Sequence, residues 1–241
     1  MNLLIYNTKD ELLHDLARYI IKIAEKSIQE QDCFNFVLTG GNSPKELYHL
    51  LATEYRDAID WTKVYFFFGD ERNVPSNHES YNGLMAKESI LDPLNIAADH
   101  IFYVPTDLAP EKAAIEYQKA IVKHFDGSDL NFDLILLGMG DDAHTASLFP
   151  KTDILKVKES AVDAVYVDKL STYRVSFTAP LINKAKNIAF LVFGESKAKA
   201  VKQVVEQEKK DSSLFPAQMI KPVDGFVTWF VDKDAASLLD N

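Results

Sequence analysis

The sequence predicts an α/β fold with a mostly parallel sheet that helices cover on both faces. Short, continuous apolar runs of strand length recur along the chain, and longer amphipathic segments separate them. Continuous hydrophobicity is typical of strands buried on both faces, and alternation of such strands with helices favours a parallel sheet. The chain has 241 residues, 47% of them hydrophobic, which is enough to bury one large core. We therefore expect a single domain over residues 1–241.

Five apolar runs are the predicted strands. They cover residues 3–6, 34–39, 64–68, 133–137 and 188–193. The first helix should begin after Thr8, because Thr8 and Glu11 have the spacing of a capping box and an apolar periodicity follows them. The later amphipathic segments predict further helices between the strands.

The acidic balance of the chain limits its partners. The formal net charge is −10, and its field repels phosphate backbones and anionic lipids, so binding to nucleic acid or to a membrane surface is disfavoured. The amino-terminal segment has acidic residues and lacks the basic start and apolar run of a secretory signal. The single cysteine, Cys33, cannot form an intrachain disulfide. We expect a cytoplasmic protein.

The loops after the apolar runs are the candidate site, because ligands of open parallel sheets bind beyond the carboxyl ends of the strands. After the second run come Gly41, Asn42, Ser43 and Pro44. Ser43 could cap the following helix, with Pro44 in its first turn, and the glycine would leave backbone N–H groups open to an anion. An ordinary glycine turn before a helix explains these residues equally well.

The loop after the third run carries a dense polar cluster. Asp70 and Arg72 would face one pocket if the strand continued through them. Only four arginines occur in the chain, and Arg72 and Arg174 both lie near predicted strand ends, where a guanidinium can bind phosphate or carboxylate. A solvated, salt-bridged loop is the competing interpretation.

His144 lies in a glycine-containing loop after the fourth run. It is the only one of the six histidines that follows a buried type of strand in such a loop. An imidazole titrates near neutrality and can take a proton from water, while a carboxylate such as Asp70 or Asp142 can fix its tautomer. A lone histidine is more often structural, so the other loops have to decide.

Lys197 lies in the first turn of the helix predicted after the fifth run. A cation at this place opposes the helix dipole, which makes sense if the ammonium group points at a bound anion. A lysine whose stem lies on the surface and whose head is in water explains the position as well.

Taken together, these segments resemble the family that comprises 6-phosphogluconolactonases and glucosamine-6-phosphate deaminases. The resemblance runs over most of the chain, in the family's order, through the segments GGNSPKELY, FFFGDERNVPSNHESYN, DLILLGMGDDAHTASLFP, YRVSFTAPLIN, FLVFGESKAKA and DGFVTWFVDKDAA. It implies a Rossmann-like fold of the sugar-phosphate isomerase and lactonase type. The sequence departs from the family pattern at Asn42, where serine or threonine is usual, and at Ala143, where glycine is usual.

The resemblance also implies a role for each candidate residue. The substrate phosphate would be held by Gly41, Asn42, Ser43 and Lys197, with Arg72 and Arg174 completing the anionic pocket. His144 would be the general base. Asp70 would orient the imidazole or a substrate hydroxyl, and Asp142 competes for that role. The family is metal-independent, so we expect neither a metal nor another cofactor, and we expect a monomer.

The implied reaction is hydrolysis of 6-phospho-D-glucono-1,5-lactone to 6-phospho-D-gluconate, the second step of the oxidative pentose phosphate pathway. Water activated by His144 would attack the lactone carbonyl, and N–H groups of residues 138–147 would stabilise the oxyanion. A glucosamine-6-phosphate deaminase is one alternative, but the Asn-Glu-Pro sequence of deaminases is replaced here by Ser147-Leu148-Phe149-Pro150. A non-catalytic sugar-phosphate sensor on the same fold is the other alternative.

Overall fold

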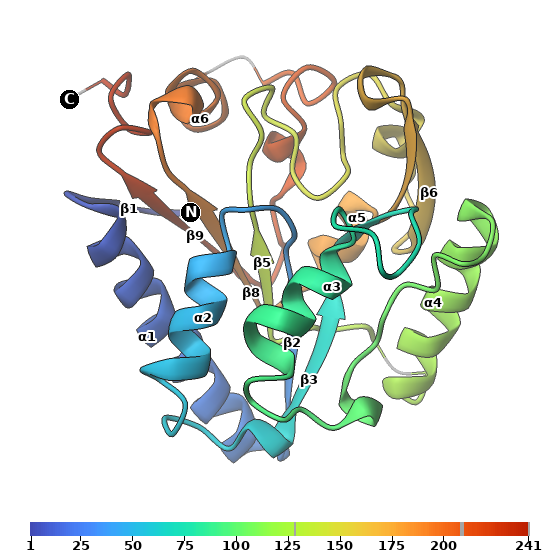
Figure 1. Cartoon of the computed structure of the whole chain (residues 1–241). Helices are drawn as coiled ribbons and strands as arrows, with labels where there is room; N and C mark the ends of the chain where they lie inside the picture. The colour runs from blue at the N-terminus through green and yellow to red at the C-terminus, as the bar shows by residue number, and fades with distance from the viewer. Residues whose placement is uncertain (128, 208–209, 241) are drawn as a thin grey trace.

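The computed structural model describes residues 1–127, 129–207 and 210–240 and shows a six-stranded parallel sheet flanked by helices (Figure 1). The strand order is β1-β9-β8-β5-β2-β3, and each neighbouring pair is parallel. The strands are β1 (Asn2–Tyr6), β2 (Phe34–Leu38), β3 (Val64–Phe68), β5 (Leu134–Leu137), β8 (Asn187–Val192) and β9 (Phe226–Asp232). The predicted fold class is confirmed.

Five of these strands coincide with the predicted apolar runs. The central strands β2 and β5 are buried along their whole length, as continuous hydrophobicity requires. The prediction from the sequence omits β9, in which the polar residue Thr228 interrupts the apolar run.

The helices are α1 (Lys9–Gln31), α2 (Lys45–Thr53), α3 (Asn82–Ala86), α4 (Pro110–His124), α5 (Ala179–Ile182) and α6 (Ala198–Val205). The predicted cap of α1 is confirmed, because the Glu11 N–H donates to the Thr8 hydroxyl at 3.2 Å. α1 and α2 pack side by side on the front face of the sheet in Figure 1.

The chain crosses the sheet in one direction from β1 to β3 and in the other from β3 to β9. Right-handed crossovers therefore place α1 and α2 on one face and α4, α5 and α6 on the other. The neighbouring strands β2 and β5 consequently send their following loops toward opposite faces. This reversal opens a crevice beyond their carboxyl ends, which is where open α/β sheets bind ligands.

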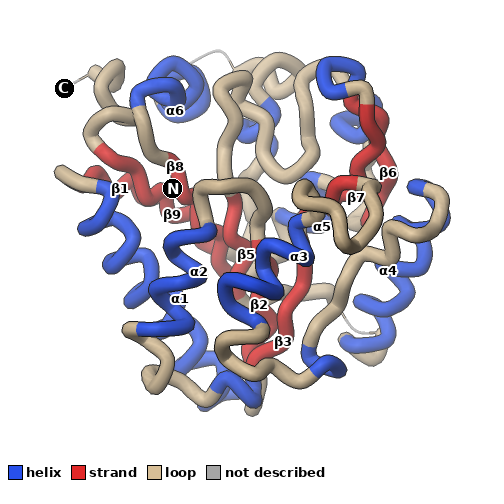
Figure 2. The backbone as a smooth tube through the Cα atoms, in the orientation of Figure 1, coloured by secondary structure: helices blue, strands red, loops and turns tan. Residues whose placement is uncertain are grey.

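A second, three-stranded antiparallel sheet lies beyond the end of the first (Figure 2). It consists of β4 (Asp70–Arg72), β7 (Thr172–Phe177) and β6 (Val162–Val167), in the order β4-β7-β6. Only Gly69 separates β4 from β3. Its N–H donates to the carbonyl of Leu38, and its own carbonyl accepts from the N–H of Phe177, so this residue joins the two sheets. The sequence analysis does not predict this sheet.

One hydrophobic core extends from the parallel sheet to the second sheet. Phe177 of β7 stacks with Phe132, which precedes β5, and with Tyr117 of α4. The Tyr117 hydroxyl accepts from the N–H of Phe68 and donates to its carbonyl, at 2.7 and 3.1 Å. These two hydrogen bonds fix the carboxyl end of β3, just before the polar segment Asp70–Arg72, to α4. Within the described ranges, no helix has the length and apolar character needed to cross a membrane.

Candidate active site

The predicted loops converge on a cavity of about 370 Å³ at the carboxyl end of the parallel sheet. The cavity occupies the crevice after β2 and β5 and is closed on one side by the second sheet. Seven of the nine predicted site residues line it: Gly41, Ser43, Asp70, Arg72, His144, Arg174 and Lys197. The other two, Asn42 and Asp142, do not line it.

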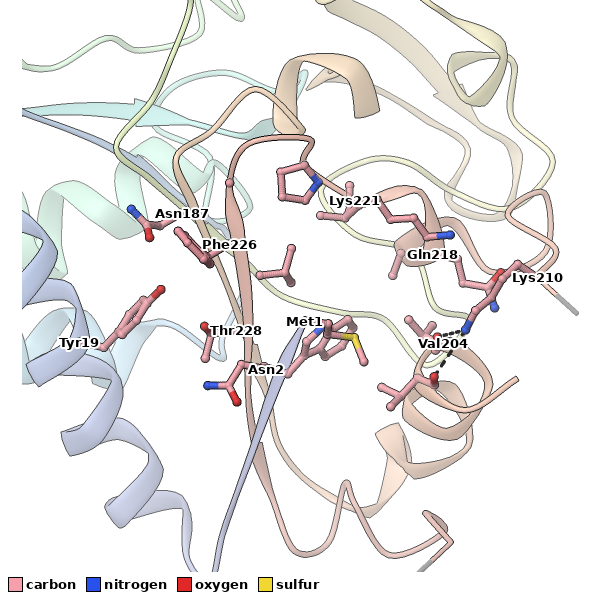
Figure 3. Close-up of a pocket in the computed structure, with 17 residues that line it drawn as sticks. Met1, Asn2, Tyr19, Asn187, Val204, Lys210, Gln218, Lys221, Phe226 and Thr228 are labelled. Atoms are coloured by element: carbon pink, nitrogen blue, oxygen red, sulfur yellow. Dashed lines mark hydrogen bonds between the residues drawn. The ribbon is translucent and has the colours of Figure 1, made fainter. Parts of the chain in front are cut away.

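A larger cavity, of about 870 Å³, lies away from this crevice, beside the amino-terminal ends of β1, β8 and β9 (Figure 3). Its lining includes Met1, Tyr19, Gln218, Phe226 and Trp229 and contains no predicted site residue. Since ligands of open parallel sheets bind at the carboxyl ends, and since the titratable groups gather there, the smaller cavity is the candidate active site.

The loop after β5 is folded tightly under the imidazole of His144. The Gly140 N–H donates to the carbonyl of His144 at 2.9 Å, and the Ala143 N–H donates to the carbonyl of Gly140 at 3.1 Å. A Cβ atom on residue 140 would lie 2.1 Å from His144 Nδ1, so only glycine allows the ring this position. On its other side the ring stacks on Phe149, with centroids 3.9 Å apart. The imidazole therefore has little freedom to turn.

Ala143 occupies a backbone position that favours glycine. Its φ angle is +61°, in the left-handed region, and its side chain is fully buried. Its carbonyl accepts from the N–H of Ala217 at 2.9 Å, which ties the loop to the segment before β9. The departure from the family pattern at this position is therefore accommodated by the same left-handed conformation that a glycine would adopt.

Asp142 is the carboxylate that contacts the imidazole. His144 Nδ1–H donates to Asp142 Oδ1 at 2.5 Å, and Lys169 Nζ donates to the other oxygen, Oδ2, at 3.0 Å. Burial acts to raise the pKa of Asp142, but the hydrogen bond and charge of His144 and the hydrogen bond from Lys169 outweigh it and hold the pKa well below its usual range. The pair thus keeps Nδ1 protonated and leaves Nε2 as the basic nitrogen.

The prediction that Asp70 orients the imidazole is wrong. Asp70 is buried, and its Oδ2 accepts from the Ser147 hydroxyl at 2.7 Å. The Ser147 N–H in turn donates to the hydroxyl of Ser176 on β7 at 3.1 Å. Asp70 therefore anchors the histidine loop to the second sheet, while it still lines the cavity, so the predicted contact with a substrate hydroxyl stays a prediction.

Two arginines from adjacent strands face the same cavity. Arg72 of β4 and Arg174 of β7 are direct partners in the antiparallel register. Arg72 Nη1 donates to the carbonyl of Ser80 at 2.8 Å, but within the described residues neither guanidinium forms an ion pair. The Nε atoms of both are buried without a hydrogen-bond partner. Two such cations side by side predict an anionic ligand between or beside them.

Burial lowers the pKa of the Arg174 guanidinium, the charge of Asp70 opposes this effect, and the charge of Arg72 adds to it. The protein therefore holds the two arginines at a cost in electrostatic free energy. An anion that neutralises them would remove that cost, which makes the pair a better binding group than an exposed arginine.

Glu71, between Asp70 and Arg72, holds β4 and the start of α3 together through hydrogen bonds to backbone N–H groups. Its carboxylate is fully buried and accepts three backbone N–H groups, from Arg72 at 2.7 Å and from Asn82 and Gly83 at 2.8 Å. Burial raises its pKa to about 8, and the three N–H donors act in the opposite direction. Because Asn82 and Gly83 open α3, the carboxylate caps this helix and ties it to β4.

The glycine loop after β2 forms the other wall of the cavity. Gly41 has a φ angle of +90°, which a side chain would strain, and Ser43 lines the cavity next to it. The predicted capping role of Ser43 is wrong: α2 begins at Lys45, with Pro44 as its cap residue, and no side chain caps it. Ser43 is turned to the cavity instead. Asn42 is exposed and outside the lining, so its predicted contact with phosphate has no support from this geometry.

Lys197 reaches the cavity from the strand next to β5. It ends a short 3-10 turn, Glu195–Lys197, that leads from β8 into α6, and its N–H donates to the carbonyl of Gly194 at 3.0 Å. Lys197 thus stands at the start of α6, as the sequence predicts, and lines the cavity.

The lining residues that the sequence analysis did not assign to the site include Met139, Phe149, Lys169 and Leu170. Met139 and Phe149 belong to the histidine loop and could have been included with it. Lys169 lies on the turn between β6 and β7, and no local pattern distinguishes it from the other surface lysines. Within the described ranges, no group of three or more histidine, cysteine, aspartate or glutamate side chains has an arrangement that could hold a metal ion.

A model of the family described as glucosamine-6-phosphate isomerases/6-phosphogluconolactonase matches residues 7–229. The chain belongs to this family. A member from Arabidopsis thaliana, named probable 6-phosphogluconolactonase 1, is 40% identical over 248 residues, which cover 98% of this chain and 92% of the relative. Another, from Oryza sativa subsp. indica and named probable 6-phosphogluconolactonase 2, is 36% identical over 249 residues, covering 98% and 89%.

Solved structures of the family have the same fold. The 6-phosphogluconolactonase of Trypanosoma cruzi superposes with a TM-score of 0.87 at 25% identity and covers 100% of this chain and 97% of its own. The enzyme of Thermotoga maritima gives a TM-score of 0.81 at 29% identity, covering 96% of this chain and 100% of its own. The family assignment thus extends over both sheets and over all the loops that form the cavity.

Proposed function

We propose that this member of the family is a 6-phosphogluconolactonase, which hydrolyses 6-phospho-D-glucono-1,5-lactone to 6-phospho-D-gluconate in the oxidative pentose phosphate pathway. The relatives that cover nearly the whole chain carry this name. The structural observation that carries the proposal is one cavity lined both by His144, whose imidazole is bound by Asp142, and by two arginines without an ionic partner. This combination suits a phosphorylated substrate with an electrophilic carbonyl.

The substrate phosphate binds the cationic wall of the cavity in this proposal. Arg72 and Arg174 supply guanidinium groups, and Lys197 with the loop at Gly41 and Ser43 supplies an ammonium group and polar donors. A phosphate held this way fixes the position of the lactone ring relative to the imidazole. Binding energy from the remote phosphate then lowers the barrier of the chemical step.

His144 acts as the general base in this mechanism. Its Nδ1–H is engaged by Asp142, so Nε2 takes a proton from water, which attacks the lactone carbonyl. Asp142 stabilises the imidazolium that forms. The ring oxygen then leaves and takes a proton, which gives the free acid. A positioned base of this kind contributes a rate factor of roughly 10²–10⁴.

The oxyanion that forms at the carbonyl requires hydrogen-bond donors. The N–H groups of Gly140, Ala143, His144 and Ser147 already donate within the protein. We therefore assign oxyanion stabilisation to other N–H groups of residues 138–147. The sequence suggests any N–H group of residues 138–147 as an oxyanion donor, and these hydrogen bonds remove four of them from that set.

The test measures hydrolysis of freshly generated lactone, coupled to 6-phosphogluconate dehydrogenase, with a chelator present. We expect the wild type to accelerate hydrolysis and His144→Ala to lose roughly 10²–10⁴-fold in turnover. His49→Ala, which changes an exposed histidine on α2, is the matched control and should keep wild-type activity. Full turnover by His144→Ala would refute the base assignment.

A wild type that does not accelerate hydrolysis would refute the proposed function. Ammonia release from glucosamine 6-phosphate would then identify a deaminase. Binding of 6-phosphogluconate with neither activity would identify a sugar-phosphate sensor.

We also propose that residues 1–241 form one domain that acts as a cytoplasmic monomer without a metal or other cofactor. The single hydrophobic core shared by both sheets supports one folding unit. Light scattering after size-exclusion chromatography should give a mass near 27.2 kDa. A mass of twice that value or more would refute the monomer.

A further inference from the structure

Lys169 makes a contact that the proposed mechanism does not yet use. It lies in the 3-10 turn Asp168–Leu170 between β6 and β7, on the second sheet. From there it reaches across the cavity to the histidine loop, where its Nζ lies 3.0 Å from Asp142 Oδ2 and 3.9 Å from Asp141 Oδ1. Asp142 thus offers one oxygen to His144 and the other to Lys169.

The turn that carries Lys169 is well defined. Ser171 closes it with a left-handed φ of +48°, and the Ser171 N–H donates to the carbonyl of Asp168 at 3.1 Å. Both Lys169 and Leu170 line the cavity, and the same hairpin continues into Arg174. One hairpin therefore contributes to the phosphate-binding wall and to the carboxylate behind the base.

We propose that Lys169 is a positioning residue for the lactonase reaction, which holds the Asp142 carboxylate in the plane where it orients His144 and which keeps the imidazole ready to accept a proton. This inference rests on the proposed function. Lys169 acts on the base through Asp142 and is not assigned a contact with the reacting atoms.

The physical argument combines restraint and charge. With one oxygen bound by Lys169, the Asp142 carboxylate cannot rotate away from His144 without losing an ion pair. The ammonium group also neutralises part of the charge of Asp142, because its Nζ lies 3.0 Å from Asp142 Oδ2. Without Lys169 the carboxylate would be held from one side only, and its full negative charge would favour the imidazolium, which is inactive as a base.

A merely structural ion pair would behave differently. The Lys169 side chain is 61% exposed, and exposed ion pairs contribute little to stability. Removing its charge should therefore leave the folded protein almost as stable as before. The effect on the base appears instead in the pH dependence of the reaction.

Several other charged groups face His144 and set the background for this effect. Asp141 and Asp142 belong to its own loop, Asp70 and Arg72 face the cavity from β4, Arg174 faces it from β7, and Lys197 faces it from the start of α6. The variants below leave all of them in place.

The experiment compares Lys169→Met, which keeps the stem and removes the charge, with Lys169→Arg, which keeps the charge. For Lys169→Met we expect a roughly three- to tenfold lower kcat/KM at pH 7 and an acid limb of the kcat/KM profile shifted to higher pH by about half a unit, as for a partly screened charge. Lys169→Arg should keep both the kcat/KM at pH 7 and the position of the acid limb at their wild-type values. Lys156→Met, which breaks a more exposed lysine–aspartate pair away from the cavity, is the control and should change neither.

A ring-proton NMR titration of His144 gives a readout that does not require turnover, and its midpoint should move in the same direction in Lys169→Met. An unchanged acid limb and midpoint, or a higher KM with an unchanged pH profile, would overturn the positioning role while wild-type lactonase activity remained. Absence of activity in the wild type would overturn the proposed function itself, and the inference with it.

Discussion

The paired arginines predict that Arg174→Met has opposite effects on the free protein and on ligand binding. Arg72 and Arg174 are directly opposite each other on β4 and β7, and like charges in such a pair destabilise a sheet by about 0.2–1 kcal/mol. Methionine keeps the length and packing of the aliphatic part of the arginine side chain but removes the guanidinium group, so that no charge is buried at this position. Since 1 kcal/mol corresponds to about 2–4 °C in a domain of this size, the Tm of the free protein should rise by up to about 4 °C.

The same substitution should weaken binding of the substrate and of 6-phosphogluconate. A hydrogen bond to a charged group contributes about 1.5–3 kcal/mol, and 1.4 kcal/mol is a factor of ten, so KM should rise roughly 10- to 100-fold. At a product concentration of about 100 Kd, the wild type gains about 2.7 kcal/mol of stability from binding. The variant should gain less than about 1.5 kcal/mol at that concentration.

Thermal unfolding with and without 6-phosphogluconate, together with KM, measures both effects. Arg56→Met removes an exposed arginine that does not line the cavity and serves as the control, which should change neither quantity. If Arg174→Met lowered the Tm of the free protein by several degrees and left KM unchanged, the reasoning would be wrong, because Arg174 would then be a structural residue.

Three further predictions concern the loops behind the cavity. In urea denaturation, the unfolding free energy of Ala143→Gly should stay within about 1 kcal/mol of the wild type, because relief of the strained left-handed backbone offsets the lost methyl group. Ala143→Val should lose several kcal/mol, and equal losses in the two variants would contradict this reasoning. Glu71→Gln should lose about 1–3 kcal/mol of unfolding free energy in the same assay and raise KM, because an amide cannot accept hydrogen bonds from all three N–H donors. An unchanged KM would show that Glu71 does not position Arg72 for substrate binding. Asp142→Asn should be less stable than the wild type at pH 6, and the gap should narrow at pH 3. The pKa of Asp142 is lower in the folded protein than in the unfolded chain, so the ionised carboxylate stabilises the fold above about pH 4, and this stabilisation is lost progressively as the pH falls below that value. A difference in unfolding free energy that stayed constant between pH 6 and pH 3 would show that the pKa of Asp142 is not shifted.

Local sequence patterns predicted the parallel sheet well, because burial on both faces leaves a signal in each strand separately. The second sheet leaves no such signal. β4 consists of Asp70, Glu71 and Arg72, and its strand geometry depends on pairing with β7 rather than on any propensity of its own. β6 is only partly buried, so its pattern resembles that of a loop or a helix edge.

The same distinction applies to the site. The loops could be predicted because parallel strands bring their carboxyl ends together, whatever the details of packing. The partner of His144 could not be chosen between Asp70 and Asp142, because the choice depended on Ser147, which occupies Asp70. Lys169 could not be found, because its approach to Asp142 is set by the register of the β6–β7 hairpin.

The single residue Gly69 between β3 and β4 divides the chemistry of the cavity between two sheets. On the proposed assignment, the parallel sheet carries the base, Lys197 and the glycine loop, and the small antiparallel sheet carries both arginines of the phosphate site. The two arginines can therefore be altered without changing the strands that carry the base. An engineer who wants the enzyme to accept a lactone with a different anionic group should redesign the faces of β4 and β7 and leave the strands of the parallel sheet untouched. Laboratory evolution for new substrates should accumulate its first successful changes in that small sheet.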